Sequence, residues 1–159
     1  MAEKAFYQSL PTKRMAAGCL FFNDNGEVLL VKPTYKESWE IPGGVTEDNE
    51  SPKQCCEREV LEEIGIVVEL KRLLVIDYNS YPQDKHKTES LMFIFDGGTL
   101  SAQDIAAIIL KEDELSDWLF FGQNHLPEQL GHSLRNRILQ AIKQKAARGA
   151  IYLENQHDV

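Results

Sequence analysis

The sequence predicts a mixed α/β fold, and three observations support this. Apolar, strand-like runs lie before and after a central stretch whose two ends carry helix start and stop signals. A second stretch near the end of the chain repeats apolar residues at helical spacing. No repeat, low-complexity tract or linker divides the 159 residues. We therefore expect one domain over residues 1–159, with a flexible N-terminus and flexible residues 155–159.

The first strands are expected to form a hairpin. Residues 15–22 and 27–31 are apolar runs, and the turn between them contains Asn25-Gly26, a pair that tolerates positive φ. Farther along, Pro42-Gly43-Gly44 breaks regular structure and lets the backbone approach a ligand closely.

The central helix has readable ends. Ser51 fits the N-cap, Pro52 fits the first helical position, and Gln54 can complete a capping box with Ser51. Gly65 is a helix stop signal. After this helix we expect strands at residues 66–81 and 88–96, short buried strands at 108–110 and 118–121, and a second helix at 127–147 that ends before Gly149.

Charge, cysteine content and the N-terminal sequence limit the partners and the cellular location that we expect for the protein. Seventeen basic and twenty-five acidic residues give a formal net charge of −8, which disfavours a long nucleic acid as a partner. Cys19, Cys55 and Cys56 lack C-x-x-C spacing, so reduced thiols are the simpler interpretation. The chain shows no leader-like start, and its longest early apolar run is too short to span a bilayer. We expect a cytoplasmic protein without a membrane partner.

Three acidic residues on the central helix are the strongest chemical signal. Glu59, Glu62 and Glu63 are spaced i, i+3 and i+4, so they project from one side of the helix. Such a triplet is usually a solvated face. Here the apolar stripe of Cys56, Val60 and Ile64 places Glu59 and Glu63 beside the core, at the border of a cleft. Clustered carboxylates suit Mg²⁺, which shares its coordination with substrate phosphates.

The segment GVTEDNESPKQCCEREVLEEIGI, from Gly44 to Ile66, resembles the Nudix signature at every defined position. The resemblance implies a Nudix-like α/β/α sandwich with a mixed sheet. It also implies Mg²⁺-dependent hydrolysis of a diphosphate bond, with Mn²⁺ as a substitute, in a small nucleotide-like substrate. Nucleoside triphosphates, ADP-ribose, nucleotide sugars and dinucleoside polyphosphates are all compatible. The alternative is a Nudix domain that binds a nucleotide as a sensor without hydrolysing it.

The resemblance also assigns roles to residues. It implies metal ligation by Glu63, Glu59, Glu62 and the carbonyl of Gly43, with Glu59 or Glu62 as the general base. Arg58 belongs to the catalytic set and, with Glu50, resembles a brace that orients the metal-binding side chains, while Gly44 is structural. The resemblance also suggests Glu114 as an additional ligand, because relatives carry such a glutamate just before the strand expected here at 118–121, although any of the three acids Glu112, Asp113 and Glu114 could instead be loop surface.

The sequence does not select one substrate. Lys32 and Arg14 are candidates for contacting a phosphate, and Tyr35 is a candidate for stacking on a base. The polar segment 81–87, which includes His86, could also reach the cleft. The oligomeric state is open, and a homodimer is compatible with the sequence.

Overall fold

A computed structural model describes residues 2–84 and 88–159, with the side chains of residues 2–4 excepted. Its helices are α1 (Ala2–Ser9), α2 (Pro52–Ile64), α3 (Ala102–Ala106) and α4 (His132–Ala147). Its strands are β1 (Arg14–Phe22), β2 (Val28–Pro33), β3 (Gly43–Val45), β4 (Arg72–Asn79), β5 (Ser90–Thr99), β6 (Leu115–Phe121), β7 (Ile151–Glu154) and β8 (His157–Asp158).

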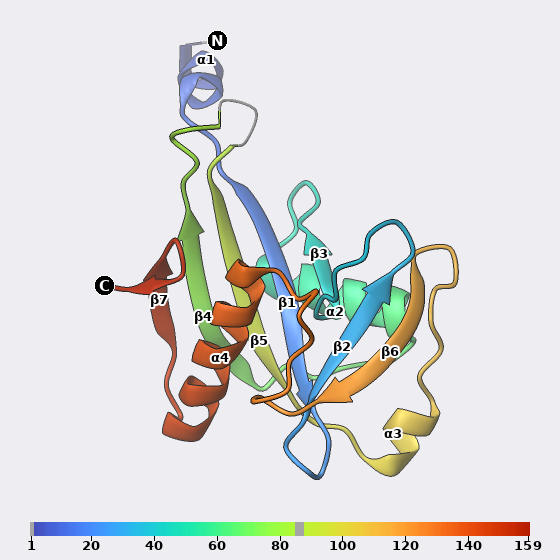
Figure 1. Ribbon diagram of the computed structural model, residues 1–159. Coiled ribbons are helices and arrows are strands. Elements are labelled where there is room, and N and C mark those ends of the chain that lie inside the picture. Colours follow the sequence, from blue (N-terminus) through green and yellow to red (C-terminus); the bar gives the residue numbers. More distant parts are fainter. Residues whose placement is uncertain (1, 85–87) are drawn as a thin grey trace.

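The strands form one mixed sheet, as the sequence predicts. Its order is β6-β2-β1-β5-β4-β7-β8, with β3 paired to β1 off this path. The pairs β1–β5 and β4–β7 are parallel, and the pairs β4–β5 and β2–β6 are antiparallel. Helix α4 covers one face of the sheet and α2 lies on the other, so the sheet is sandwiched between helices (Figure 1).

The first hairpin forms, but its strands separate immediately. Gly26 adopts a φ of 74° in the turn, and the N–H of Asn23 donates to the carbonyl of Glu27 at 3.0 Å. Strands β1 and β2 then share only the register pair Phe22–Val28. Beyond that point β2 pairs with β6 while β3 pairs with β1. The fork between β1 and β2 leaves room for the segment that leads into the acidic helix.

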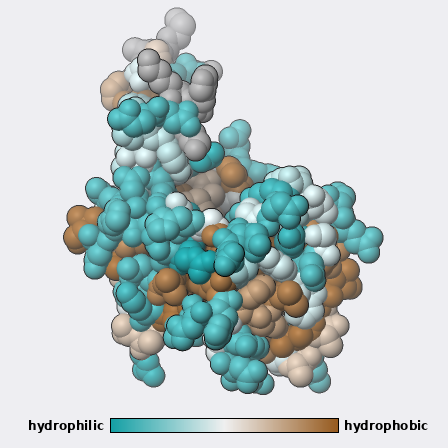
Figure 2. Space-filling model, viewed as in Figure 1, coloured by the Kyte–Doolittle hydropathy of each residue, from teal (hydrophilic) through white to brown (hydrophobic). Residues whose placement is uncertain are grey.

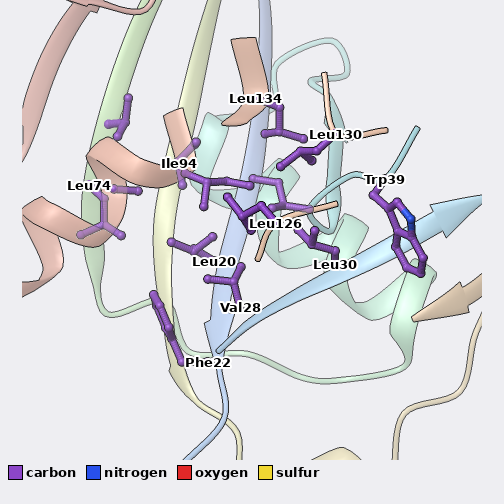
Figure 3. Packing of buried hydrophobic residues seen from close by; sticks show 14 of the residues in the cluster. Leu20, Phe22, Val28, Leu30, Trp39, Leu74, Ile94, Leu126, Leu130 and Leu134 are labelled. Carbon is purple, nitrogen blue, oxygen red and sulfur yellow. The ribbon is translucent and has the colours of Figure 1, made fainter. Parts of the chain in front are cut away.

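Each face of the sheet has its own hydrophobic core. On the α4 face, strand residues such as Leu20, Leu30 and Ile94 pack against Leu126, Leu130 and Leu134 from α4 and the loop before it (Figure 3). On the other face, Cys56, Val60 and Ile64 of α2 pack against the sheet and are fully buried. This confirms the apolar stripe expected for the central helix.

The ends of α2 also agree with the sequence. Ser51 is the N-cap, its hydroxyl accepts from the N–H of Gln54, and the reciprocal bond completes the capping box. Pro52 is the first helical residue, and Gly65 ends the helix in the left-handed conformation with a φ of 72°. Because these signals are local, they fix the register of the three glutamates on the helix.

One of the expected strands is shorter than predicted, and another is absent. The strand predicted at 66–81 is limited to β4, because Ile66 and Leu70 are buried without joining the ladder. Residues 108–110 are not a strand. Instead, the N–H of Ile109 donates to the carbonyl of Ile64 at 3.0 Å, and the N–H of Lys111 donates to that of Glu63 at 3.0 Å. This segment satisfies the last carbonyls of α2, which have no partner within the helix.

Other boundaries also differ from those expected. The strand predicted at 88–96 is β5, which continues through Gly97 and Gly98 in a bulge against β1. A Cβ at Gly97 would lie 2.4 Å from the ring of Phe21, so the bulge requires glycine. The second helix starts at His132 instead of residue 127, because residues 127–130 form a turn. Arg148, not Gly149, takes the left-handed C-cap position.

The two ends of the chain contain structure that the sequence did not predict. Helix α1 projects away from the body of the molecule, with Phe6 and Tyr7 exposed (Figures 1 and 2). At the other end β8 folds back on β7, so part of segment 155–159 is in a strand. The flexibility expected at both ends stays a prediction. Within the described residues no helix has the length and apolar character needed to cross a bilayer, and the three cysteines are free and buried.

Candidate active site

The fork between β1 and β2 opens onto a cleft beside α2. This acidic cleft has a volume of about 120 Å³, and three segments distant in sequence bring carboxylates into it: the segment before β3 through Glu40, α2 through Glu63, and the residue before β6 through Glu114. Its lining residues are Val31, Pro33, Tyr35, Lys36, Glu40, Ile41, Gly43, Glu63, Glu114 and Leu115. The structure therefore places Glu63 in the lining of a cleft, as expected, whereas Glu59, expected there too, lines neither this cleft nor the apolar one described below.

Glu63 is the most perturbed carboxyl group of the cleft. Its Oε2 accepts a hydrogen bond of 2.8 Å from the backbone N–H of Gly43. The pKa of Glu63 is raised to about 7, chiefly by burial and also by the nearby carboxylates of Glu59, Glu114 and Glu40, while the hydrogen bond from the Gly43 N–H opposes the rise. The cleft therefore concentrates more negative charge than its own donors compensate.

The two glycines of β3 allow the loop to lie against both β1 and α2. Gly43 has a φ of 151°, and a Cβ there would lie 2.2 Å from the carbonyl oxygen of Ala17. A Cβ at Gly44 would lie 2.3 Å from Oε1 of Glu59. Glycine at these positions brings the backbone into contact with the acidic face of α2, which larger residues would prevent.

Arg58 connects several carboxylates around the site. Its Nε and Nη2 bind the two oxygens of Glu50 at 2.8 and 3.0 Å, a bidentate pair. Its Nη1 donates to Glu59 at 2.8 Å and to Glu62 at 3.3 Å. Arg58 holds the pKa of Glu50 down at about 2. One guanidinium thus contacts Glu50 and two members of the acidic triplet, the arrangement expected of a brace.

Glu114 lies across the cleft from α2. Its backbone is fixed at the start of β6, because its carbonyl accepts from the N–H of Thr34 at 2.8 Å. Its side chain is paired with Lys111 at 2.6 Å and remains 45% exposed. Glu114 therefore reaches the same cleft as Glu63, as its position before a strand suggested.

The oxygen donors of the site suit a hard divalent cation, although the carboxylate side chains do not yet surround one common position. In the described part of the chain, no group of three acidic, histidine or cysteine side chains is arranged so that it could hold a metal ion. The reason is visible in the contacts: Arg58 holds Glu59 and Glu62, while Gly43 holds Glu63. These carboxylates would have to turn from their present partners, and the uncompensated charge around Glu63 favours doing so.

A second cleft lies on the α4 side of the same loop. This apolar cleft has a volume of about 180 Å³ and is lined by Ala16, Ala17, Gly18, Glu40, Ile41, Gly43, Gly44, Val45, Met92, Ile94, Leu134 and Arg137. Glu40, Ile41 and Gly43 line both clefts. The two clefts are therefore neighbours on either side of these three residues.

The candidate substrate residues are distributed unevenly. Tyr35 lines the acidic cleft and is 76% exposed. Lys32 lies 3.4 Å from Glu37 and over the ring of Trp39, and Arg14 is exposed at the start of β1. Neither Lys32 nor Arg14 is among the residues that line the two clefts. Residues 85–87, including His86, lie outside the described residues.

Sequence reasoning missed three residues of the clefts. Glu40 and Lys36 form an ion pair of 2.8 Å at the acidic cleft, and Arg137 lines the apolar one. A signal for Arg137 did exist, because it follows Leu134 by three positions and so interrupts the apolar stripe of the second helix. Trp39, just before these cleft residues, is a core residue: it is 8% exposed and its ring contacts that of Phe121 edge to face.

Known proteins resemble this chain in sequence. It is 44% identical over 78 residues to diphosphoinositol polyphosphate phosphohydrolase 2 of Rattus norvegicus, a match to 48% of this chain and 42% of that protein. It is 37% identical over 83 residues to 8-oxo-dGTP diphosphatase of Proteus vulgaris, covering 50% of this chain and 73% of the relative. The chain thus spans less than half the length of the first relative.

Solved structures share the fold at lower identity. A MutT protein from Methanosarcina mazei superimposes with a TM-score of 0.69 at 22% identity, covering 86% of this chain and 99% of that one. A UDP-X diphosphatase gives a TM-score of 0.75 at 22% identity, covering 96% of this chain and 75% of that one. The family model of the NUDIX domain matches residues 12–142, which include the acidic helix and most of the sheet, and the chain therefore belongs to the Nudix hydrolase family.

Proposed function

We propose that this chain hydrolyses a diphosphate bond in a small nucleotide-like substrate and that the reaction requires Mg²⁺, for which Mn²⁺ can substitute. The substrate classes are those that the sequence suggests: nucleoside triphosphates, ADP-ribose, nucleotide sugars and dinucleoside polyphosphates. The observation that carries the proposal is the placement of Glu63 and Glu114 in one cleft beside the Gly43-Gly44 backbone.

Each element of the site has a role in this proposal. Glu63 would hold the cation together with the carbonyl of Gly43 and with Glu59 or Glu62, whichever is not the base, and Glu114 would add a ligand from the residue before β6. Arg58, fixed by Glu50, orients Glu59 and Glu62. Gly44 keeps the space that Glu59 occupies free of a side chain. Tyr35 contributes to the mouth of the cleft.

The proton transfer is assigned to Glu59 or Glu62. One of them accepts a proton from the attacking water, and the other remains a ligand. When bound, a divalent cation supplies positive charge that offsets the charge on the diphosphate and favours deprotonation of water. Members of the Nudix family generally use divalent metal cations, and the carboxylate donors of this site favour Mg²⁺ among them.

The test is a panel of the four substrate classes assayed with Mg²⁺, with Mn²⁺ and with EDTA. We expect release of phosphate or of a nucleoside monophosphate with either cation and none in EDTA. Full turnover in EDTA would contradict the metal-dependent mechanism. Binding without turnover under every condition would instead favour the alternative of a sensor domain.

A further inference from the structure

Arg137 is a buried cation that the proposed hydrolytic chemistry does not use. Its side chain is 10% exposed, and it projects from α4 into the apolar cleft. Its Nε donates to Oδ2 of Asp77 at 2.5 Å, and its Nη2 donates to Oδ1 of Asn79 at 2.8 Å. No oxygen of the described residues accepts from Nη1. The edge of the guanidinium formed by Nε and Nη2 is therefore hydrogen-bonded within the protein, whereas Nη1 can still donate to a group in the cleft.

The charge of Arg137 is already balanced. Asp77 is fully buried in β4, and its carboxylate forms the ion pair with Arg137. The other charged residue that lines the cleft, Glu40, is acidic, and most of the remaining wall is apolar. A polyanionic group would meet no uncompensated cation here and would lose its hydration. An uncharged group with a hydrogen-bond acceptor would satisfy Nη1 without this cost.

We propose that Arg137 is a specificity-determining residue that donates from Nη1 to an uncharged acceptor, such as a carbonyl oxygen of a nucleobase, on the part of the substrate beyond the diphosphate. This inference rests on the proposed function, and it applies to a substrate that lies against Glu40, Ile41 and Gly43, the residues that line both clefts. The substrate is then a nucleoside diphosphate derivative and not a polyphosphorylated polyol.

The C-terminal turn holds Arg137 in this orientation. Gln156, between β7 and β8, donates from its backbone N–H to Asp77 at 3.0 Å. Its side-chain amide donates to Asp77 at 3.1 Å and to Asn79 at 2.6 Å. Both acceptors of Arg137 are thus fixed by one residue, and parallel pairing of β7 with β4 places the turn beside them (Figure 1). Gln156 is a positioning residue that acts through Asp77 and Asn79.

The test is binding in EDTA, measured by NMR titration with guanosine and uridine, and with inositol hexakisphosphate as the polyanionic probe. Arg137→Lys keeps a cation for Asp77 but lacks the planar fork of donors. We expect it to weaken nucleoside binding roughly 10- to 100-fold, the effect of losing a hydrogen bond to a charged donor. Arg135→Met is the matched control, because Arg135 lies on the same helix but donates to the carbonyl of Pro127 at 2.6 Å. It should bind nucleosides like the wild type.

A second variant tests the turn. Gln156→Asn retains a residue that tolerates the φ of 67° but shortens the amide that reaches Asp77 and Asn79. On a nucleotide that the wild type hydrolyses, we expect KM to rise several-fold with kcat within about twofold. Loss of stability alone would not raise KM while leaving kcat nearly unchanged. An unchanged KM would refute the positioning role.

Two results would overturn the assignment of Arg137. One is nucleoside binding as tight in Arg137→Lys as in the wild type, or absent from both. The other is tighter, salt-sensitive binding of inositol hexakisphosphate that Arg137→Lys removes. Because the titration is done without metal, it does not depend on turnover. Nucleoside binding that depends on Arg137, combined with no hydrolysis of any substrate, would support this inference and contradict the proposed reaction.

Discussion

Two arginines on opposite faces of the sheet organise the two clefts in different ways. Arg58 on α2 is 25% exposed and contacts carboxylates that lie one, four and eight residues away in the chain. Arg137 on α4 is 10% exposed and contacts Asp77 and Asn79, which are 60 and 58 residues away. The first cluster is local and partly hydrated, whereas the second is assembled by the fold.

The difference indicates that the two arginine clusters have different functions. Three carboxylates share the one guanidinium of Arg58, and that of Glu62 is also 46% exposed to water, so individual contacts in this cluster can be exchanged, and this suits side chains that must turn toward a cation. The network around Arg137 cannot rearrange without leaving a buried charge unpaired, and this suits a rigid recognition element. We therefore expect substitutions on α2 to change catalysis and substitutions around Arg137 to change stability and binding.

The largest expected effect is on turnover. Replacing the true general base, Glu59→Gln or Glu62→Gln, should lower kcat about 10²–10⁴-fold, because the amide preserves shape but removes basicity. The two variants should differ, since only one residue is the base. Initial rates with Mg²⁺ measure this effect. Glu57→Gln is the matched control, because Glu57 lies on the same helix and pairs only with Lys53, at 3.6 Å, among the described residues. Near-wild-type rates in both variants would show that the base lies elsewhere.

The second prediction is that substitutions of the two arginines differ in their effect on the stability of the protein. Arg137→Met leaves the buried carboxylate of Asp77 without its counter-ion, although the hydrogen bonds from Gln156 remain, and this should cost about 3–5 kcal/mol in the free energy of unfolding. Arg58→Met leaves Glu50, Glu59 and Glu62 partly exposed, at 13%, 16% and 46%, and should cost less, about 1–2 kcal/mol. Urea denaturation of both variants measures the two values. Equal losses would mean that the comparison between the clusters is wrong.

A third effect is a pH dependence confined to the acidic cleft. The pKa of Glu63 is about 7 in the fold, above its usual value of 4.5, so the folded protein binds more protons than the unfolded chain between these values. Without metal, stability should therefore fall by roughly 1–3 kcal/mol as pH rises from 4.5 to 7. Thermal melts in EDTA across this range should show the decline in the wild type. Glu63→Gln should reduce it, and an unchanged slope would contradict the assignment to Glu63.

The smallest effect concerns the brace. Glu50→Gln weakens the bidentate contact with Arg58 and should lower kcat several-fold, because Arg58 then orients Glu59 and Glu62 less well. Glu47→Gln is a suitable control, since its side chain is exposed. Steady-state kinetics on one verified substrate would distinguish the two. A change in KM alone would argue against an orienting role for Glu50.

The same contrast explains what could be predicted from the sequence. The cap at Ser51, the stop at Gly65 and the spacing of the glutamates are signals within a few residues, so α2 and its acidic face could be predicted correctly. Segment 108–110 looked like a strand because its apolar residues carry no sign that they would cap α2. The contacts of Arg137 depend on β4, more than fifty residues away in the chain, and on the turn at Gln156, and no local pattern reveals them.

The most direct test of the account is a paired measurement on Glu63→Gln, with Mg²⁺ affinity by calorimetry and initial rate on a verified diphosphate substrate. We expect this variant to fold, because the amide oxygen that replaces the carboxylate can still accept from the N–H of Gly43. A melt in EDTA should therefore show a stability at least equal to that of the wild type at pH 8, where the wild-type carboxylate is charged. The account predicts that Mg²⁺ affinity and rate fall together. Unchanged affinity and rate in the folded variant would contradict the placement of the catalytic metal beside Glu63.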